Sequence, residues 1–170
     1  MIGYVIALVI LIFLSGVFSS TEIAMFSLSN LKVRYLVEQE VPGSRLLARL
    51  KEDSHKLLIT ILIGNNIVNI ASAAIATALA IDLFGSVGVG IATGVMTLLI
   101  LIAGEILPKA FATTNAQRIA IFMSPALNVL MKLFYPFVWL FDKLTTAIIP
   151  KQTSVLPRLT EEEVMNIVDI

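Results

Sequence analysis

The sequence comprises 170 residues, of which 58% are hydrophobic and 14% are charged, and its mean hydropathy is +0.94. A soluble domain is about 45–50% apolar, so this composition excludes an ordinary soluble protein and predicts an integral membrane protein. The 12 basic and 12 acidic residues cancel, which leaves no basic surplus for a nucleic-acid partner, and the absence of cysteine excludes disulfides and thiolate metal sites.

The first apolar stretch, about residues 4–28, can cross a hydrocarbon core of about 30 Å as a tilted helix. It lacks a basic leader and a small-residue cleavage pattern, so we expect a retained span and not a signal peptide. Ser15, Ser19 and Glu22 fall on one helix face, which must face protein because a carboxylate inside a span costs about 2.5 kcal/mol or more. For Ser15 and Ser20, the alternative is a hydrogen bond to the carbonyl one turn earlier.

The following segment, residues 30–56, is rich in charge, and its basic residues mark the cytoplasmic side of the membrane. Pro42-Gly43 divides it, so we predict two short juxtamembrane amphipathic helices within about 30–53.

A second span is predicted over about residues 57–81, and its middle is polar. Gly64, Asn65, Asn66 and Asn69 are costly groups at that depth. A single asparagine often only joins two helices by a hydrogen bond, but three amides within five residues indicate a polar site.

The connection 82–90 carries no Lys or Arg, which places it outside the cell. A third span then covers about residues 87–107 and returns the chain to the cytoplasm. We therefore predict an N-terminus outside and a cytoplasmic C-terminus.

The third span ends in Gly104-Glu105-Ile106-Leu107-Pro108-Lys109. Pro108 lacks an N–H, so a helix arriving here is expected to kink or end with the Gly104 carbonyl unbonded, beside the Glu105 carboxylate. The alternative is a proline-terminated helix in which Glu105 pairs with Lys109 one turn later.

Residues 118–148 are predicted to form two interfacial helices, broken by Pro125, Lys132 and Pro136. A fourth span over residues 119–141 is the alternative, but it would place the later basic residues outside, against the charge rule.

All of these polar clusters fall between the midplane and the cytoplasmic side, as one shared site requires. Their ligand atoms are oxygens, which select Mg²⁺, Ca²⁺, Mn²⁺ or an alkali ion over zinc or copper. Lys109 would compensate the charge of the site when the ion leaves. No nucleophile–base pair or protease signature is present, so we do not expect an enzyme. The candidate metal ligands are Ser15, Ser19, Ser20, Glu22, Gly64, Asn65, Asn66, Asn69, Gly104 and Glu105.

Three strings, residues 15–24, 63–71 and 104–109, resemble the transmembrane domain of the cyclin-M / CorC family of magnesium transporters. The resemblance covers about residues 1–150. It implies a homodimer of all-α protomers in the lipid of the plasma membrane, each with three spans and a belt of juxtamembrane helices. It also implies export of Mg²⁺, with Na⁺ as the exchanged ion.

In that family, cytoplasmic CBS domains normally follow the transmembrane domain. We read residues 151–170 as the start of a linker toward such domains, which this sequence does not include, with Thr160 as the N-cap of a helix.

Two other functions remain open: a divalent cation channel, and a membrane anchor or sensor that transports nothing. A channel requires a continuous wet pathway, whereas these polar groups cluster at one depth and the outer part of the third span is expected to be apolar. Ion flux in liposomes that contain only this protein would discriminate among the three.

Overall fold

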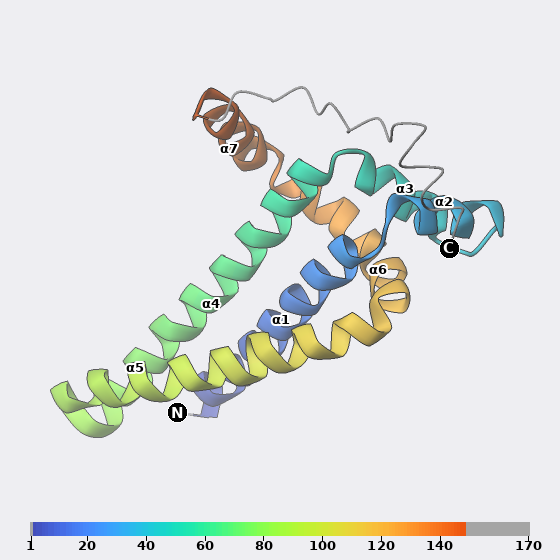
Figure 1. The fold of residues 1–170 in the computed structure, drawn as a ribbon. Coiled ribbons are helices and arrows are strands. Elements are labelled where there is room, and N and C mark those ends of the chain that lie inside the picture. Colours follow the sequence, from blue (N-terminus) through green and yellow to red (C-terminus); the bar gives the residue numbers. More distant parts are fainter. Residues whose placement is uncertain (1, 149–170) are drawn as a thin grey trace, which may run out of the picture.

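The computed structural model describes residues 2–148, with side chains through Leu144. This part of the chain is helical apart from short connections and contains no strand. It confirms the predicted all-helical fold class (Figure 1). The elements are α1 Ile2–Ser27, α2 Asn30–Glu38, α3 Ser44–Glu52, α4 Ser54–Phe84, the 3₁₀ turn η1 Gly85–Val87, α5 Gly88–Leu99, the π-helical segment η2 Ile100–Ile106, α6 Leu107–Leu133 and α7 Tyr135–Ile148. The predicted linker, residues 151–170, and its Thr160 cap lie outside the described residues.

Two long helical arms diverge from the turn at Gly85, and α1 lies between them (Figure 1). One arm is α4, and the other is the continuous run of α5, η2 and the first part of α6. Helix α1 packs against α4 on one side and against η2 and α6 on the other. The N-terminus of α1 lies near the Gly85 turn, whereas α2 and α3 lie at the opposite end, so the molecule has a Gly85 end and an α2–α3 end.

The turn between the arms depends on two glycines. Gly85 has a φ of 65°, which side chains other than glycine rarely adopt. A Cβ on Gly88 would lie 2.1 Å from the Ala80 carbonyl oxygen, so only glycine allows α5 to start this close to α4. The arms are therefore held together at the Gly85 end by backbone contact.

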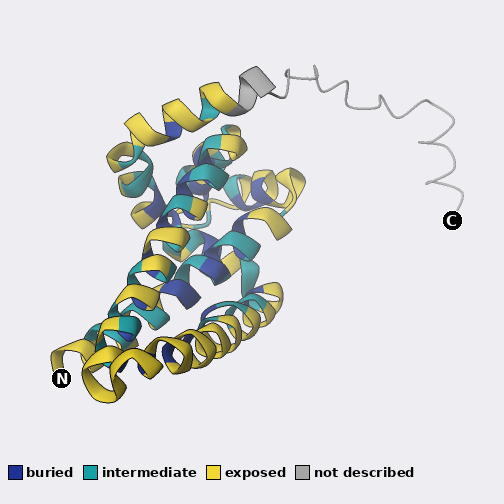
Figure 2. Ribbon diagram, turned by 90° about the vertical axis from the view of Figure 1, so that its left-hand side faces the viewer, coloured by how far each residue is buried: buried dark blue, intermediate teal, exposed yellow. Residues whose placement is uncertain are grey.

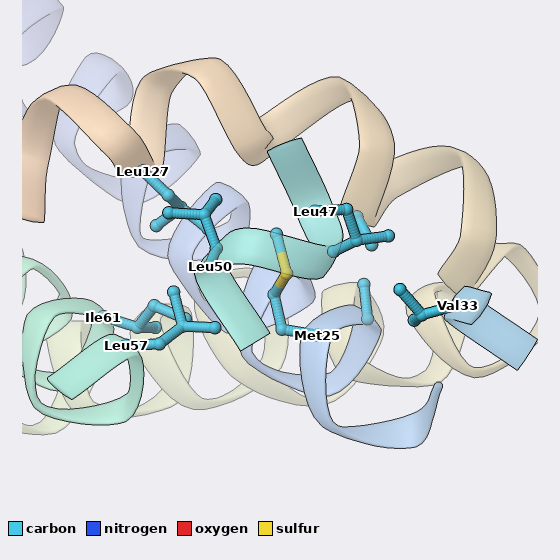
Figure 3. Packing of buried hydrophobic residues seen from close by; sticks show 9 residues of the cluster. Met25, Val33, Leu47, Leu50, Leu57, Ile61 and Leu127 are labelled. Atoms are coloured by element: carbon cyan, nitrogen blue, oxygen red, sulfur yellow. The ribbon is translucent and has the colours of Figure 1, made fainter. Parts of the chain in front are cut away.

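The hydrophobic core lies at the α2–α3 end (Figure 3). Side chains from α1, α2, α3, α4 and the second part of α6 meet there, and most are completely buried. The two short helices predicted on either side of Pro42-Gly43 are present, and their apolar faces complete this core. The residues drawn and labelled are Met25, Val33, Leu47, Leu50, Leu57, Ile61 and Leu127.

Lys51 of α3 fastens the end of α1 to this core. Its ammonium donates to the Met25 carbonyl at 2.9 Å and also to the Leu28 carbonyl. A cation is favourable at a helix C-terminus, where carbonyl groups lack partners within the helix. Partial burial desolvates this ammonium and lowers the pKa of Lys51.

Helix α6 bends at Asn115, where φ is −118° and ψ is 19°, and its second part packs onto the core. The predicted break at Pro125 is wrong, because α6 continues through this residue and ends only at Leu133. Packing of Ala120 and Leu127 on the core holds the helix together despite the one hydrogen bond that proline removes. Helix α7 follows and contacts the start of α4. The Oδ1 atom of Asp142 on α7 lies 3.5 Å from the Nε2 atom of His55 on α4.

Much of the surface toward the Gly85 end is exposed and apolar (Figure 2). Phe13 on α1 is 71% exposed and Leu98 on α5 is 59% exposed. Two helical stretches are long and apolar enough to cross a membrane, Ile2–Ser27 and Ser54–Leu133, and the second reverses direction at Gly85. The stretch Ser54–Leu133 thus contains both the second and the third apolar segments that the sequence analysis predicted as spans.

Candidate metal centre

Most of the predicted site residues lie on α1, α4 and η2, which pack together. On one side, the ring of Phe18 lies against Gly64, where an added Cβ would come within 2.4 Å of the ring. On the other side, Ser15 lies against Gly104, where an added Cβ would come within 2.7 Å of the hydroxyl oxygen. The absence of a side chain at Gly64 and at Gly104 therefore lets α1 approach α4 and η2 closely. This helix packing is the role that the structure shows for Gly64.

The segment around Pro108 differs from the predicted kink or helix end. The chain stays helical through η2, whose wider π turn lets the N–H of Leu107 donate to the Ile102 carbonyl, five residues back. The π turn absorbs the local misfit before a proline, and π segments are frequent at functional sites. The Gly104 carbonyl accepts a hydrogen bond from Ser15 Oγ at 3.4 Å.

Four buried oxygen atoms have no hydrogen-bond partner within the described residues. Ser44 Oγ lies on α3, and the other three, Ser19 Oγ, Asn65 Oδ1 and Asn69 Oδ1, lie on α1 and α4. Buried polar atoms are nearly always bonded, so an unpartnered set calls for a bound water or ion. Neighbouring hydroxyls are ordinary by comparison, because Ser20 donates to the Val17 carbonyl and Ser72 to the Val68 carbonyl. Ser20 thus follows the alternative interpretation, a bond within its own helix, whereas Ser15 does not.

Glu105 is half-buried and makes no hydrogen bond or ion pair with any other described residue. The alternative in which it pairs with Lys109 is wrong, because the Lys109 ammonium lies 3.2 Å from Glu22 Oε2 on α1. The carboxylate lines a cavity of about 330 Å³ between α4, α5 and η2. Glu105 is therefore a carboxylate without a cationic partner in the described structure.

Glu22 and Lys109 form an ion pair one helical turn from the site, toward the α2–α3 end. Their side chains are 24% and 36% exposed, so neither is fully desolvated. The ion pair couples α1 to the start of α6. Glu22 was predicted as a metal ligand, and the structure instead gives its carboxylate a basic partner.

The predicted residues thus separate into groups. Ser15, Ser19, Asn65, Asn69 and the Gly104–Glu105 pair lie on the three helices that meet, whereas Asn66 is exposed on α4, apart from the buried amides. No cluster of three or more His, Cys, Asp or Glu side chains suited to a metal occurs in residues 2–144. A metal held here would be bound by neutral oxygens and one carboxylate, which suits a hard cation.

The threonines that share the cavity with Glu105 were missed by the sequence reasoning. Thr77, Thr93 and Thr97 line it, so the outer part of the third segment is less apolar than expected. The available signal was spacing, since Thr93, Thr97 and Glu105 recur at multiples of four residues.

An all-helical domain whose long apolar helices enclose unpartnered oxygens belongs to the class of helical membrane proteins with a polar site between helices. Comparison with known proteins identifies the family. The chain matches the family described as the cyclin M transmembrane N-terminal domain over residues 6–170, and it belongs to that family. The predicted resemblance is confirmed. The family comprises membrane proteins linked to divalent cation transport and is not an enzyme family.

Several relatives are similar over most of this chain. A UPF0053 protein of Haemophilus influenzae is 41% identical over 84% of the chain and 34% of its own length. The UPF0053 inner membrane protein YfjD of Escherichia coli is 35% identical over 78% of the chain and 31% of its own length. A chloroplastic DUF21 domain-containing protein of Arabidopsis thaliana is 42% identical over 76% of the chain and 20% of its own length. The chain thus spans between about a fifth and about a third of the length of these relatives. The similarity supports a location in a membrane.

Proposed function

We propose that this domain exports Mg²⁺ across the plasma membrane in exchange for Na⁺. The observation that supports this most is the set of three buried, unpartnered oxygens of Ser19, Asn65 and Asn69. In a membrane domain, such atoms are costly unless a ligand satisfies them. The family gives that ligand a chemical class, a divalent cation.

The donor set suits Mg²⁺ among the divalent cations. Mg²⁺ prefers oxygen ligands and is usually bound through one or two carboxylates, with other oxygens completing its shell. Here Glu105 would supply the charge, and the hydroxyl and amide oxygens would supply neutral ligands. Zinc and copper prefer nitrogen or sulfur ligands. The chain has one histidine, His55, and it pairs with Asp142 and not with the polar residues of this site.

The Glu22–Lys109 pair has a role in this scheme at the cytoplasmic mouth of the site. A cation that approaches from the α2–α3 end meets the Glu22 carboxylate first, and it must compete there with the Lys109 ammonium. Lys109 lies one turn after Glu105 in the sequence, but its ammonium contacts Glu22. Charge compensation at Glu105 when the ion leaves would therefore require the Lys109 ammonium to exchange the Glu22 carboxylate for that of Glu105.

The proposed orientation follows from charge. Apart from Lys109, every Lys and Arg of the described part lies on α2, α3, the first turn of α4, the second part of α6 or α7, whereas the Gly85 end carries only Asp82. By the positive-inside rule, the α2–α3 end is cytoplasmic, and α1, α4 and the α5–η2 arm are three spans.

We also propose a homodimer, followed in the complete protein by cytoplasmic CBS domains, as the family resemblance implies. The α5 face that carries Gly90 and Gly94 is open in the protomer, because nothing lies within 4 Å of a Cβ at either position. Small residues on an open face allow close packing of a second helix in a membrane.

Replacement of Asn65 by leucine tests the proposed site. Asn65→Leu has similar size but removes an unpartnered acceptor, so it should raise the unfolding temperature of the metal-free protein, by the equivalent of about 1–3 kcal/mol. It should also reduce the stabilisation that Mg²⁺ gives by linkage. Both effects are measured by thermal unfolding in detergent with and without MgCl₂.

Asn66→Leu is the matched control, because Asn66 is the neighbouring amide and is exposed. It should leave the Mg²⁺ response unchanged. If Asn65 only joins helices, Asn65→Leu will instead lower the unfolding temperature and keep the Mg²⁺ response, which would contradict the proposal.

A further inference from the structure

A groove at the α2–α3 end of the molecule takes no part in the proposed ion site. It measures about 500 Å³ and lies where the junction of α3 and α4 meets the junction of α6 and α7 (Figure 1). Its apolar lining residues are Leu50, Met131 and Val138. None of the predicted metal ligands lines it, so the groove requires an explanation of its own.

The charged side chains of this groove are mainly basic. Arg49 of α3, Lys56 of α4 and Lys132 of α6 line it, and Asp53 is the only carboxylate among its described lining residues. The lining residues therefore carry a net charge of +2. The Lys56 ammonium contacts Oδ2 of Asp53, so these two groups balance each other. Arg49 and Lys132 contact no acidic group among residues 2–144, which leaves two cations available to a ligand.

Two neutral polar side chains complete the lining. Asn128 is half-buried on α6, and its amide makes no hydrogen bond with another described residue. Tyr135 is the first residue of α7. Amide N–H and phenol O–H groups can donate to anionic oxygens, and guanidinium and ammonium groups bind phosphate oxygens strongly. The groove thus offers hydrogen-bond donors from four side chains to an anion with several acceptor oxygens, such as a phosphate group.

Aromatic residues of α7 indicate the depth of the groove in a membrane. Tyr135 and Trp139 are four residues apart and share a helix face, and their exposed fractions are 60% and 47%. The Lys143 ammonium lies 4.2 Å from the centre of the Trp139 ring. Tyr and Trp are enriched at the level of the lipid headgroups, and lysine side chains reach toward the same level. We therefore expect the groove to open where the phosphates of the lipids lie.

Charge and apolar lining together select the ligand. A free phosphate ion would leave the apolar wall of the groove unused, whereas a phospholipid joins a phosphate to apolar chains. A zwitterionic lipid would leave the net positive charge unbalanced. We propose that this groove binds an anionic phospholipid, whose phosphate is held by Arg49 and Lys132 and whose chains run along the apolar lining. In the proposed orientation, the groove faces the cytoplasmic leaflet, which carries the anionic lipids.

A lipid bound here would join parts of the chain that are far apart in the sequence. The walls of the groove come from residues 49–56 and 128–138. A phosphate held by Arg49 on one wall and Lys132 on the other strengthens the packing of these two junctions. This proposal goes beyond ion export and does not depend on it, because no proposed metal ligand takes part.

The single tryptophan of the chain, Trp139, provides the measurement. The purified protein is reconstituted in phosphatidylcholine vesicles with a minor share of phosphatidylglycerol. Brominated acyl chains, which quench tryptophan fluorescence at short range, are placed on the phosphatidylglycerol or on an equal share of the phosphatidylcholine. For the wild type, brominated phosphatidylglycerol should quench Trp139 several-fold more effectively. Arg49→Gln/Lys132→Gln, which removes the two available cations, should lose most of this preference.

Lys32→Gln/Arg45→Gln is the matched control, because it changes the net charge equally at exposed residues of α2 and α3 outside the groove. It should keep the preference for phosphatidylglycerol. Each variant is first checked by size-exclusion chromatography. If Arg49→Gln/Lys132→Gln does not fold, Arg49→Gln alone should reduce the preference.

A further arm of the experiment distinguishes a lipid from a soluble anion. Inorganic phosphate that replaces chloride at equal ionic strength should leave the preference unchanged. If phosphate abolishes the preference, the groove takes its ligand from water and the lipid assignment is wrong. If the wild type shows no preference, or if the groove variant and the control variant keep or lose it equally, the basic end attracts anionic lipids only in general and the inference is overturned.

Discussion

Lys109 lies one helical turn after Glu105 in the sequence, yet its ammonium contacts Glu22 on another helix. The pairing matters for the chemistry of the site, because a Glu105 without a cationic partner keeps its charge available to an incoming ion. Glu22, in contrast, is already balanced. We therefore propose different roles for the two carboxylates: Glu105 binds the ion, whereas Glu22 holds α1 to α6 through its contact with Lys109.

The ion pair predicts a coupling between two substitutions. Glu22→Gln leaves the Lys109 charge without its partner in a half-buried position and should lower the free energy of unfolding by about 1 kcal/mol, a value between those for exposed and buried pairs. Glu22→Gln/Lys109→Gln should recover part of this loss. Thermal unfolding of the single and double variants in a double-mutant cycle measures the coupling.

Lys132→Gln serves as the control, since Lys132 is an exposed lysine of α6, the helix that carries Lys109. Its effect should add to that of Glu22→Gln without coupling. Strict additivity of Glu22→Gln and Lys109→Gln would show that the pair contributes nothing.

At this scale, the sequence could supply the candidate residues but not their partners. Local spacing made Glu105 and Lys109 plausible neighbours, whereas the contact with Glu22 joins residues 87 positions apart and depends on how α1 packs against α6. The same limit applies to Ser15, whose two possible acceptors, its own helix or Gly104, cannot be distinguished by spacing alone.

Helix α1 is the element that brings the site together, because it contacts both arms. Its position depends on the close fit of Phe18 to Gly64 on α4. Two independently predicted polar segments become one site only when this packing is correct.

A methyl group at Gly64 should therefore disturb the site through α1. Its Cβ would lie 2.4 Å from the Phe18 ring, so Gly64→Ala should lower the free energy of unfolding by about 1–3 kcal/mol and weaken the Mg²⁺ response. Gly64→Ala/Phe18→Leu, which creates room, should restore part of both. Thermal unfolding with and without MgCl₂ measures the two effects.

Gly94→Ala is the control, because nothing lies within 4 Å of a Cβ there in the protomer. The packing account is contradicted if Gly64→Ala leaves stability unchanged, or if Phe18→Leu makes the Gly64→Ala variant worse.

At the scale of elements, helix existence was predictable and local geometry was not. The apolar stretches and the Pro42-Gly43 break predicted the helices on either side of them. The π segment η2 was not predicted, because Pro108 indicates only that an α-helical hydrogen bond is missing and not how the chain accommodates its loss. The bend at Asn115 likewise depends on packing against the core.

The whole molecule has two unlike ends. The α2–α3 end holds the core and nearly all basic residues, and the Gly85 end is apolar and carries one acidic residue. The distribution of charge along the sequence predicted this division, because the charged residues are already segregated along the chain.

The orientation can be tested by single-cysteine labelling, because the chain contains no cysteine. Ser86 and Gln39 are exposed and lie at opposite ends of the molecule. An impermeant thiol reagent should label Ser86→Cys from outside intact cells and Gln39→Cys only after the membrane is opened. Labelling of both positions from the same side would exclude the three-span arrangement.

The central claim is that Glu105 binds the transported ion, and Mg²⁺ flux into proteoliposomes tests it most directly. Glu105→Gln keeps the shape of the side chain but removes the charge that balances a divalent cation, and Glu38→Gln, on an exposed carboxylate of α2, is the control. The wild type and the control should carry Mg²⁺, whereas Glu105→Gln should elute from size-exclusion chromatography as the wild type does and lose nearly all flux. A folded Glu105→Gln protein that carries Mg²⁺ at close to the wild-type rate would contradict the account.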